Sequence, residues 1–440
     1  MSVPPVTSHD AARQATRGIA FLPFQVDHLL LLIGENPLPN YVAARTLLKV
    51  GGTPHLVYTK HTKPQADRLR DLLKERSPDL KDCQYVFLDN YESDSYHIQK
   101  GIQDTIKRYA QERLGLNYTG GTKPMATHAY RALLKIQPHA IFSYLDPRKL
   151  EMCIDREDGE RFHEKVTLEL PLTELFQLHN LTLQSPPTME PTLPNVAQAF
   201  TEFYQDKSLA DSWRKWCDNT LRPTARKGQK WLSEIKLQSL DLPLAYSENS
   251  SFSDQVQKEL PDEIKAVLQK HFGAGTEVLK FQLAKEQGAF QKYKHLCEWL
   301  DGIWLEHYTL QQVQSIAVDS HIHDSALSFP VKNPKTGQDK FELDVAFMRN
   351  YQLFAISCTA DDNKGLCKSK LFEAYLRAKQ LGGDEARVAL VCCSDQPDAL
   401  KQELEVMLED SKIKVFGREH LSNLADEITA WINQLDREAK

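Results

Sequence analysis

Residues 117–125, Asn117-Tyr118-Thr119-Gly120-Gly121-Thr122-Lys123-Pro124-Met125, place two adjacent glycines between a strand-like run and a helical run. Glycine lets the backbone of such a turn approach a ligand closely, and the start of the helix leaves its amides unpaired at the positive end of its dipole. Pro124 suits a first helical position because its φ angle is already helical. The stretch predicts a phosphate-binding turn, although a tight turn that needs glycine for its geometry alone has the same pattern.

The sequence around this turn alternates regularly between strand-like and helical runs. The strand-like runs are His28–Ile33, His55–Tyr58, Tyr85–Leu88, Leu114–Tyr118 and Ala140–Tyr144. The helical runs between them are Asn40–Val50, Pro64–Arg76, Ser93–Arg113 and Pro124–Ile136. This alternation predicts a parallel sheet with helices on both faces, whose ligands bind beyond the carboxyl ends of the strands. The loop Gly34–Asn40 is expected at the same edge as the glycine turn.

A second α/β unit of a different kind is predicted for residues 280–437. A helical run, Ala284–Val313, comes first, and a helix at Leu366–Leu381 and a buried strand at Val388–Cys393 come last. Between them lie strand-like runs at Ile316–Asp319, Ala326–Val331, Phe341–Met348 and Tyr351–Cys358, with hairpin-loop residues at Asn333–Gly337. This order of elements is that of a restriction-endonuclease-like core.

Two acidic residues of this unit are candidate metal ligands. Asp344 lies among apolar residues of a strand-like run, and Glu306 lies late in the helical run. An acidic side chain is costly to bury unless it binds something. Mg²⁺ and Mn²⁺ prefer oxygen ligands, and two carboxylates from separate elements can share one such ion. The sequence therefore predicts a metal site at Glu306 and Asp344.

A nuclease site of this type also needs a carboxylate and a lysine two residues apart on the next strand. Ser357 and Thr359 occupy these positions and point to one face by the strand period, but they bring no charge. Lys370 and Glu373 share a stripe of the following helix, so a lysine from this helix can supply the missing charge. An ordinary solvated helix face has the same pattern.

The two halves together resemble the CARF-domain nucleases of type III CRISPR systems. In the first half the resemblance is carried by the loop Gly34–Asn40 and by residues 117–125. In the second half it is carried by Trp304-Leu305-Glu306, Glu342-Leu343-Asp344-Val345 and Leu381-Gly382-Gly383. It implies an N-terminal Rossmann-like CARF domain with a parallel sheet and a C-terminal PD-(D/E)xK nuclease domain of α/β type. The expected segments are a flexible tail (1–24), the CARF domain (25–183), a linker and mainly helical region (184–275) and the nuclease domain (276–440).

The resemblance also implies a function. Members of this family bind a cyclic oligoadenylate, here expected to be cyclic tetra-adenylate, across the two CARF domains of a homodimer, and binding repositions the nuclease domains over DNA or RNA. The expected ligand-binding residues are Glu35, Asn36, Pro37, Asn40, Thr59, Asn117, Thr119, Gly120, Gly121, Thr122 and Lys123. The expected catalytic residues are Glu306, Asp344, Ser357, Thr359 and Lys370, of which Glu306 and Asp344 hold Mg²⁺ or Mn²⁺. The alternatives are a ligand sensor with a catalytically degenerate nuclease fold and a small-molecule enzyme with a nucleotide substrate.

Composition limits the remaining possibilities. A net charge of −6 argues against nucleic-acid binding by the whole surface, but it permits a local basic groove. No apolar run approaches the roughly 20 residues of a membrane helix, and residues 1–18 lack the apolar core of a signal peptide. The 8 cysteines, without a CxxC pair, suit free thiols in a reducing cytosol, so we expect a cytoplasmic protein.

Three tryptophans interleave with basic residues in the mainly helical region. Trp213, Trp216 and Trp231 lie among arginines and lysines of residues 195–260. Aromatic and basic side chains together can stack nucleic-acid bases and neutralise phosphates. An amphipathic helix with its tryptophans turned inward gives the same pattern.

Overall fold

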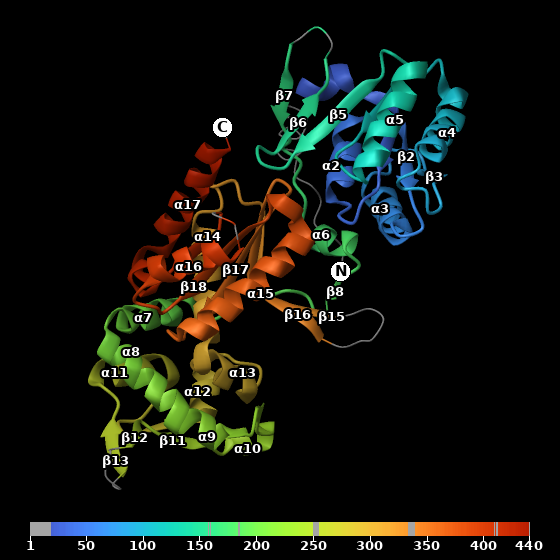
Figure 1. Cartoon of the computed structure of the whole chain (residues 1–440). Coiled ribbons are helices and arrows are strands. Elements are labelled where there is room, and N and C mark those ends of the chain that lie inside the picture. The colour runs from blue at the N-terminus through green and yellow to red at the C-terminus, as the bar shows by residue number, and fades with distance from the viewer. Residues whose placement is uncertain are drawn as a thin grey trace.

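The computed structural model describes residues 19–156, 158, 160–183, 185–249, 255–332, 339–408, 410 and 412–439. These residues form two α/β domains with a smaller, mainly helical arm beside the second (Figure 1). The expected hairpin loop Asn333–Gly337 lies outside the described residues. Of the expected tail, residues 19–24 are described, and they form the 3₁₀ helix η1 (Ile19–Phe24).

The first domain contains the predicted parallel sheet. Its strands lie in the order β3-β2-β1-β4-β5-β6-β7, and the first five of these are parallel. They are β1 (Val26–Leu32), β2 (Leu48–Tyr58), β3 (Gln84–Phe87), β4 (Leu114–Asn117), β5 (Ile141–Asp146), β6 (Glu151–Ile154) and β7 (Phe162–Lys165). Helices α2 (Leu38–Leu47) and α3 (Lys63–Arg76) cover one face, and α4 (Ser95–Ile106) and α5 (Lys123–Ile136) cover the other. The Rossmann-like prediction is confirmed.

The second domain has a mixed sheet in the order β19-β18-β17-β16-β15-β8. Its strands are β8 (Thr182–Leu183), β15 (Asp324–Lys332), β16 (Asp339–Arg349), β17 (Gln352–Thr359), β18 (Arg387–Cys392) and β19 (Lys414–Phe416). The strands from β8 to β17 pair antiparallel, whereas β17, β18 and β19 are parallel. Helices α14 (Trp304–Ser315) and α17 (Leu424–Glu438) pack on one face, and α15 (Lys364–Gly382) and α16 (Pro397–Leu408) pack on the other.

Two local predictions for this domain are wrong. Residues 316–319 form turns after α14 and no strand, because a short apolar run does not distinguish a strand from the end of a helix. The long helical run is divided into α12 (Phe281–Gln287), α13 (Tyr293–Glu298), the π-helical turn η4 (Trp299–Ile303) and α14. Gly302 interrupts it with a φ of +149°, a backbone conformation that lies outside the helical region.

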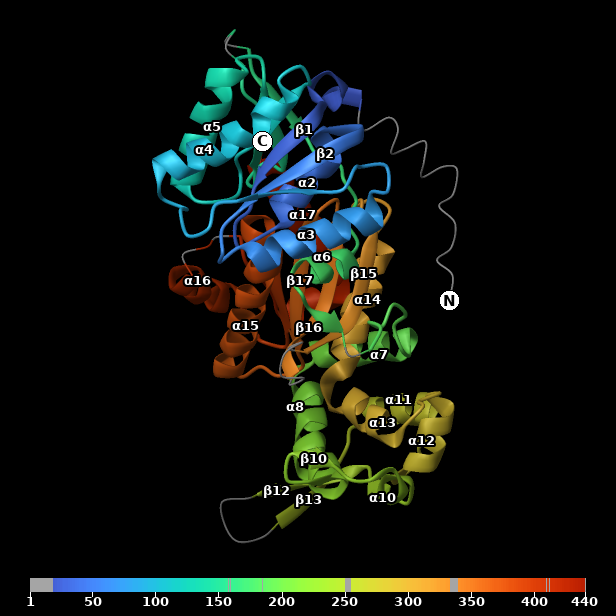
Figure 2. The same cartoon turned by 90° about the vertical axis from the view of Figure 1, so that its right-hand side faces the viewer.

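The two domains share one continuous hydrophobic core. Helix α6 (Leu172–Leu178) lies between α3 and the second sheet (Figure 2). The Tyr41 hydroxyl donates to Glu174 Oε2 at 3.1 Å, and the Leu172 amide donates to Asp324 Oδ2 at 2.8 Å. Buried residues of β1, α2 and α3 belong to the same cluster as those of β16, β17 and α15. A junction of this kind transmits displacement from one domain to the other, because packed interiors compress little.

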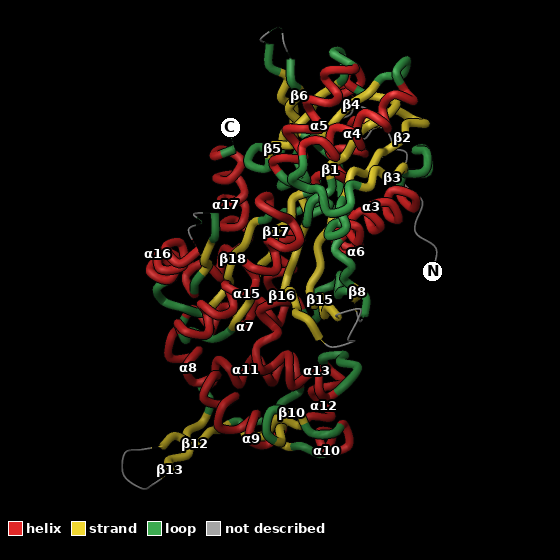
Figure 3. The backbone as a smooth tube through the Cα atoms, turned by 45° about the vertical axis from the view of Figure 1, so that its right-hand side comes forward, coloured by secondary structure: helices red, strands yellow, loops and turns green. Residues whose placement is uncertain are grey.

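The arm consists of short helices and hairpins outside the second sheet (Figure 3). Its helices are α7 (Pro194–Gln205), α8 (Lys207–Trp216), α9 (Arg222–Ala225), α10 (Glu234–Gln238) and α11 (Asp262–Phe272), with α12 and α13; its strands are β9 (Arg226–Lys227), β10 (Lys230–Trp231), β11 (Asp241–Pro243), β12 (Ala245–Asn249), β13 (Gln255–Glu259) and β14 (Val278–Lys280). Trp213 and Trp216 are buried, as the amphipathic-helix interpretation requires. Trp231 is only partly buried, and the Arg226 guanidinium lies 3.9 Å from its ring centre.

Two further properties of the described residues concern the cysteines and the length of the helices. All 8 cysteines are free thiols, and Cys83 and Cys153 are the two that are only partly buried. In the part of the chain that the structure describes, no helix combines the length and the apolar character that crossing a membrane requires.

Candidate functional site

The glycine turn stands at the start of α5, at the carboxyl edge of the first sheet. Gly121 has a φ of +75°, and a Cβ atom on Gly120 would lie 2.2 Å from the Leu32 carbonyl oxygen. Both positions therefore require glycine. The Thr122 hydroxyl caps α5 by accepting the Met125 amide at 3.2 Å, and it donates to the Glu92 carbonyl at 2.7 Å. The turn is thus fixed before any ligand binds.

The loop after β1 lies directly against this turn. A Cβ atom on Gly34 would lie 3.1 Å from the Gly121 nitrogen, so the two backbones touch. The buried Asn40 donates from Nδ2 to the Leu32 carbonyl at 2.9 Å, and no described residue donates to its Oδ1. The structure therefore brings together the two loops that the sequence singled out.

The remaining predicted ligand residues divide into buried and accessible groups. Asn117 donates to Ser143 Oγ at 3.0 Å, and Thr119 Oγ1 accepts the Leu145 amide at 2.7 Å, so both side chains hold neighbouring strands. Pro37 and Thr59 are also buried. Glu35 and Lys123 are exposed, and Asn36 is partly exposed. Lys123 stands at the first position of α5, where its ammonium adds to the positive end of the helix dipole.

The second candidate site surrounds Asp344 on β16. Its Oδ2 accepts the Ser357 hydroxyl at 2.8 Å and the Cys358 amide at 2.7 Å, both from β17. The Lys370 ammonium on α15 lies 3.7 Å from the same oxygen. Asp344 is 9% exposed, and its carboxylate borders a small cavity. The cavity is lined by Glu342, Leu343, Asp344, Ile356, Ser357, Lys370, Glu373 and Ala374.

Glu306 belongs to the same electrostatic cluster. Burial raises the pKa of Glu306 well above its ordinary value of 4.5, and the charges of Asp344 and Glu342 raise it further, whereas Lys370 opposes the rise. Burial alone lowers the pKa of Lys370, but the carboxylates of Asp344 and Glu306 outweigh it, and the pKa lies above 10.5. Two carboxyl groups and one ammonium therefore act on one another.

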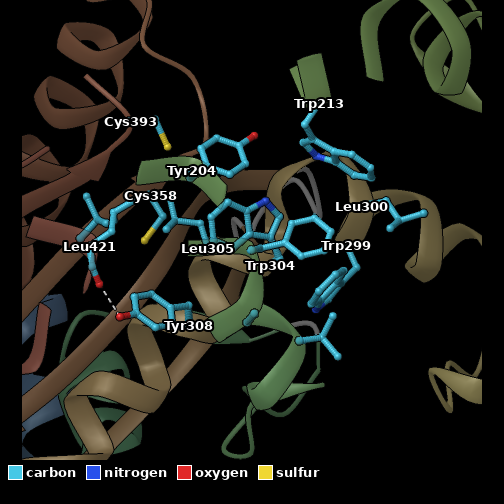
Figure 4. Packing of buried hydrophobic residues seen from close by; sticks show 14 of the residues in the cluster. Tyr204, Trp213, Trp299, Leu300, Trp304, Leu305, Tyr308, Cys358, Cys393 and Leu421 are labelled. Atoms are coloured by element: carbon cyan, nitrogen blue, oxygen red, sulfur yellow. Dashed lines mark hydrogen bonds between the residues drawn. The ribbon is translucent and has the colours of Figure 1, made fainter. Parts of the chain in front are cut away.

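Helix α14 holds Glu306 through its buried neighbours. The Trp304 ring packs against Phe200 and Tyr204 of the arm. Leu305 and Tyr308 belong to the same buried cluster, and the Tyr308 hydroxyl donates to the Leu421 carbonyl (Figure 4). The side chains of Trp304, Leu305 and Tyr308 have no exposed area. Glu306 projects from a helix that packs on β15, β16 and β17, so its backbone position is well defined.

Thr359 lies away from the Asp344 cavity. It stands at the end of β17 and lines a second cavity, together with Arg214, Arg222 and Asp301 from the arm and its junction. Arg214 is paired with Asp362 at 2.6 Å, and Arg222 with Asp301 at 2.7 Å. Strand alternation predicted one face for Ser357 and Thr359. Ser357 bonds to Asp344, whereas Thr359, two residues further along β17, lines the second cavity. Glu342 and Glu373, which also line the cavity, were not among the expected catalytic residues.

The donor set suits a hard divalent cation only in part. Glu306 and Asp344 offer carboxylate oxygens, which Mg²⁺ and Mn²⁺ prefer, and a cation between them would relieve the repulsion that raises the pKa of Glu306. Within the described residues, no group of three or more His, Cys, Asp or Glu side chains has the geometry of a metal site. Any ion bound here would keep open positions for water or substrate.

Comparison with known proteins agrees with this fold. Residues 293–435 match the family model of the Card1-like endonuclease domain. Among solved structures, protein VC1899 from Vibrio cholerae aligns with a TM-score of 0.70 at 17% identity, over 93% of this chain and 98% of that protein. Can2 from Sulfobacillus thermosulfidooxidans, solved in complex with cyclic tetra-adenylate, aligns with a TM-score of 0.66 at 16% identity, over 92% and 99%. No curated protein sequence matches the chain. Residues 293–435 are therefore similar to the Card1-like endonuclease domain, and the chain as a whole has the two-domain fold that VC1899 and Can2 share.

Proposed function

We propose that this protein is a metal-dependent nuclease of CRISPR antiviral defence that a cyclic oligoadenylate activates. The observation that carries the proposal is the contact of Asp344 with Lys370 at one cavity, together with the buried Glu306 that interacts electrostatically with both, in residues similar to the Card1-like endonuclease domain. The anion-binding turn in the same chain supports control by a ligand rich in phosphates. Cyclic tetra-adenylate is the first candidate activator, because Can2 was solved with it.

The residues around Asp344 and Glu306 have separate roles in this proposal. Glu306 and Asp344 would hold Mg²⁺ or Mn²⁺, which supplies a polarised water and neutralises charge on the phosphoryl group. The Ser357 hydroxyl and the Cys358 amide fix the orientation of Asp344. Lys370 supplies the positive charge that β17 lacks, and it stabilises the negative charge that develops on the phosphoryl oxygens.

The glycine turn at the carboxyl edge of the first sheet suggests which ligand binds and how the protein assembles. A ring with several phosphates matches a symmetric pair of helix N-termini better than a single one, so we propose a homodimer with the glycine turns near its two-fold axis. In this proposal the activator lies against both loops, Gly34–Asn40 and residues 117–125. The substrate is DNA, RNA or both. A cytoplasmic location suits the free thiols.

One experiment separates this function from its alternative. The protein is incubated with Mg²⁺ or Mn²⁺, labelled single- and double-stranded DNA and RNA, and a panel of cyclic oligoadenylates. The proposal expects cleavage that depends on both metal and cyclic ligand and that Asp344→Ala abolishes. Ligand binding without cleavage under any metal favours a sensor with a degenerate nuclease fold. If the protein neither binds a cyclic oligoadenylate nor cleaves nucleic acid, the proposal is wrong.

A further inference from the structure

The end of helix α15 contacts the loop that follows β1. Gly383, just past this helix, has a φ of +62°, and a Cβ atom there would lie 2.7 Å from Asn36 Nδ2 and 3.0 Å from Glu385 Oε2. A Cβ atom on Gly382 would lie 2.9 Å from Ala386 Cβ. The Asn36 amide thus rests on the backbone of the nuclease domain, and the glycines leave no space between them.

The same loop touches the predicted ligand turn at its other end. Gly34 lies against the Gly121 nitrogen, as described above. Asn36 Oδ1 accepts the Leu38 amide at 3.0 Å. This bond orients the side chain and directs Nδ2 toward Gly383. A short and internally bonded segment therefore connects the anion-binding turn of one domain with the end of α15 in the other.

Helix α15 carries Lys370 in its N-terminal half, away from Gly382. Lys370 and Gly382 lie about 18 Å apart along the helix axis, at 1.5 Å per residue. The buried face of the helix packs on β17 and β18 through Cys367, Leu371, Ala374, Ala378 and Leu381. A packed helix of this kind shifts as a unit, typically by about 1–2 Å. Because the Lys370 ammonium lies 3.7 Å from Asp344 Oδ2, a shift of this size decides whether the two groups touch.

We propose that the contact between Asn36 and Gly383 transmits ligand occupancy to the nuclease cavity, with α15 as the rigid connection to Lys370. A ligand that displaces the Gly34–Asn40 loop moves the end of α15, and the helix moves the Lys370 ammonium relative to Asp344. This inference rests on the proposed function, since it names how the same cavity is regulated. It assigns a role to the Asn36 side chain, whose amide contacts Gly383 across the boundary between the two domains.

The test compares two glycines with the same positive φ angle. Gly383→Ala inserts a methyl group where the Asn36 amide rests. Gly228→Ala is the matched control, because Gly228 also has a φ of +62° and has nothing within 4 Å of its Cβ position. For each variant and for wild type, calorimetry gives the affinity for cyclic tetra-adenylate, and a cleavage assay gives kcat with and without saturating ligand. Hydrogen exchange of residues 364–382 reports on the helix itself.

The inference expects Gly383→Ala to bind the ligand but to lose about tenfold or more of its stimulation, a coupling of the usual size, whereas Gly228→Ala is stimulated like wild type. In Gly383→Ala the ligand should leave the hydrogen exchange of α15 unchanged, whereas in wild type the ligand changes it. If wild type and Gly383→Ala are stimulated equally, the inference is wrong and the proposed function stands. If wild type binds no cyclic oligoadenylate, the proposed function fails and the inference fails with it.

Discussion

The Lys370 ammonium lies 3.7 Å from Asp344 Oδ2, although the two residues come from different elements, α15 and β16. The strand beside Asp344 offers only the Ser357 hydroxyl and a backbone amide. A helix thus brings a cation to Asp344, whereas the neighbouring strand β17 brings none. This arrangement makes the chemistry of the cavity testable one side chain at a time.

Replacing Lys370 by Ala should lower ligand-stimulated kcat by about 10²–10³, the usual effect of removing one group that stabilises developing charge. Lys368→Ala is the matched control, because the Lys368 ammonium pairs with Glu403 on α16 instead. The cleavage rate of both variants and of wild type is measured in single-turnover assays at saturating ligand. Equal rates for Lys370→Ala and wild type would show that Ser357 and the metal suffice.

Asp344→Asn should abolish Mn²⁺ binding measured by calorimetry while leaving the affinity for the cyclic ligand unchanged. The asparagine side chain keeps the shape and can still accept from Ser357 and Cys358, but it loses the charge that attracts a divalent cation. Glu373→Gln is the control in the same cavity and should weaken Mn²⁺ binding less, since Glu373 is exposed. Loss of ligand binding in Asp344→Asn would mean that Asp344 is structural.

Lys123→Glu should prevent binding of cyclic tetra-adenylate without changing the melting temperature. Lys123 is exposed at the first position of α5, so its replacement reverses a charge beside the helix N-terminus. Arg131→Glu, also exposed but in the middle of the same helix, changes the net charge equally and should bind normally. Calorimetry distinguishes them. Normal binding by Lys123→Glu would remove this turn from consideration as the ligand site.

Glu385→Gln should make the protein more stable above neutral pH. Burial raises the pKa of Glu385 from 4.5 to about 7. Between these values the folded protein keeps a proton that the unfolded chain has released, so the stability from this group is complete below about pH 4.5 and is lost as the pH rises toward 7. The loss amounts to about 3 kcal/mol. Urea unfolding of wild type and variant at pH 5 and pH 8 measures it, and a difference that does not change with pH would contradict the pKa.

Much of the fold was predictable because its signals are local. The alternation of strand-like and helical runs in residues 27–145 matches the order of β1 to β5 and α2 to α5, since apolar periodicity follows directly from which face of each element is buried. The expected helix to Val50 is wrong at its end, because β2 already begins at Leu48. The strand predicted at residues 316–319 is wrong, and the division of the long helical run before α14 was not predicted. In both cases the deciding factor is a turn or a glycine conformation that hydropathy does not encode.

The sequence by itself determined that the chain has two α/β units, that a glycine turn starts α5, and that Asp344 and Ser357 share a face of adjacent strands. These follow from period, from the conformational freedom of glycine and from strand alternation. Only the tertiary structure decided that Lys370 reaches Asp344, that Thr359 does not, and that Asn36 rests on Gly383. Each of these depends on how a helix or loop packs against a distant strand, and packing is set by the shapes of both surfaces together, which no single stretch of sequence contains.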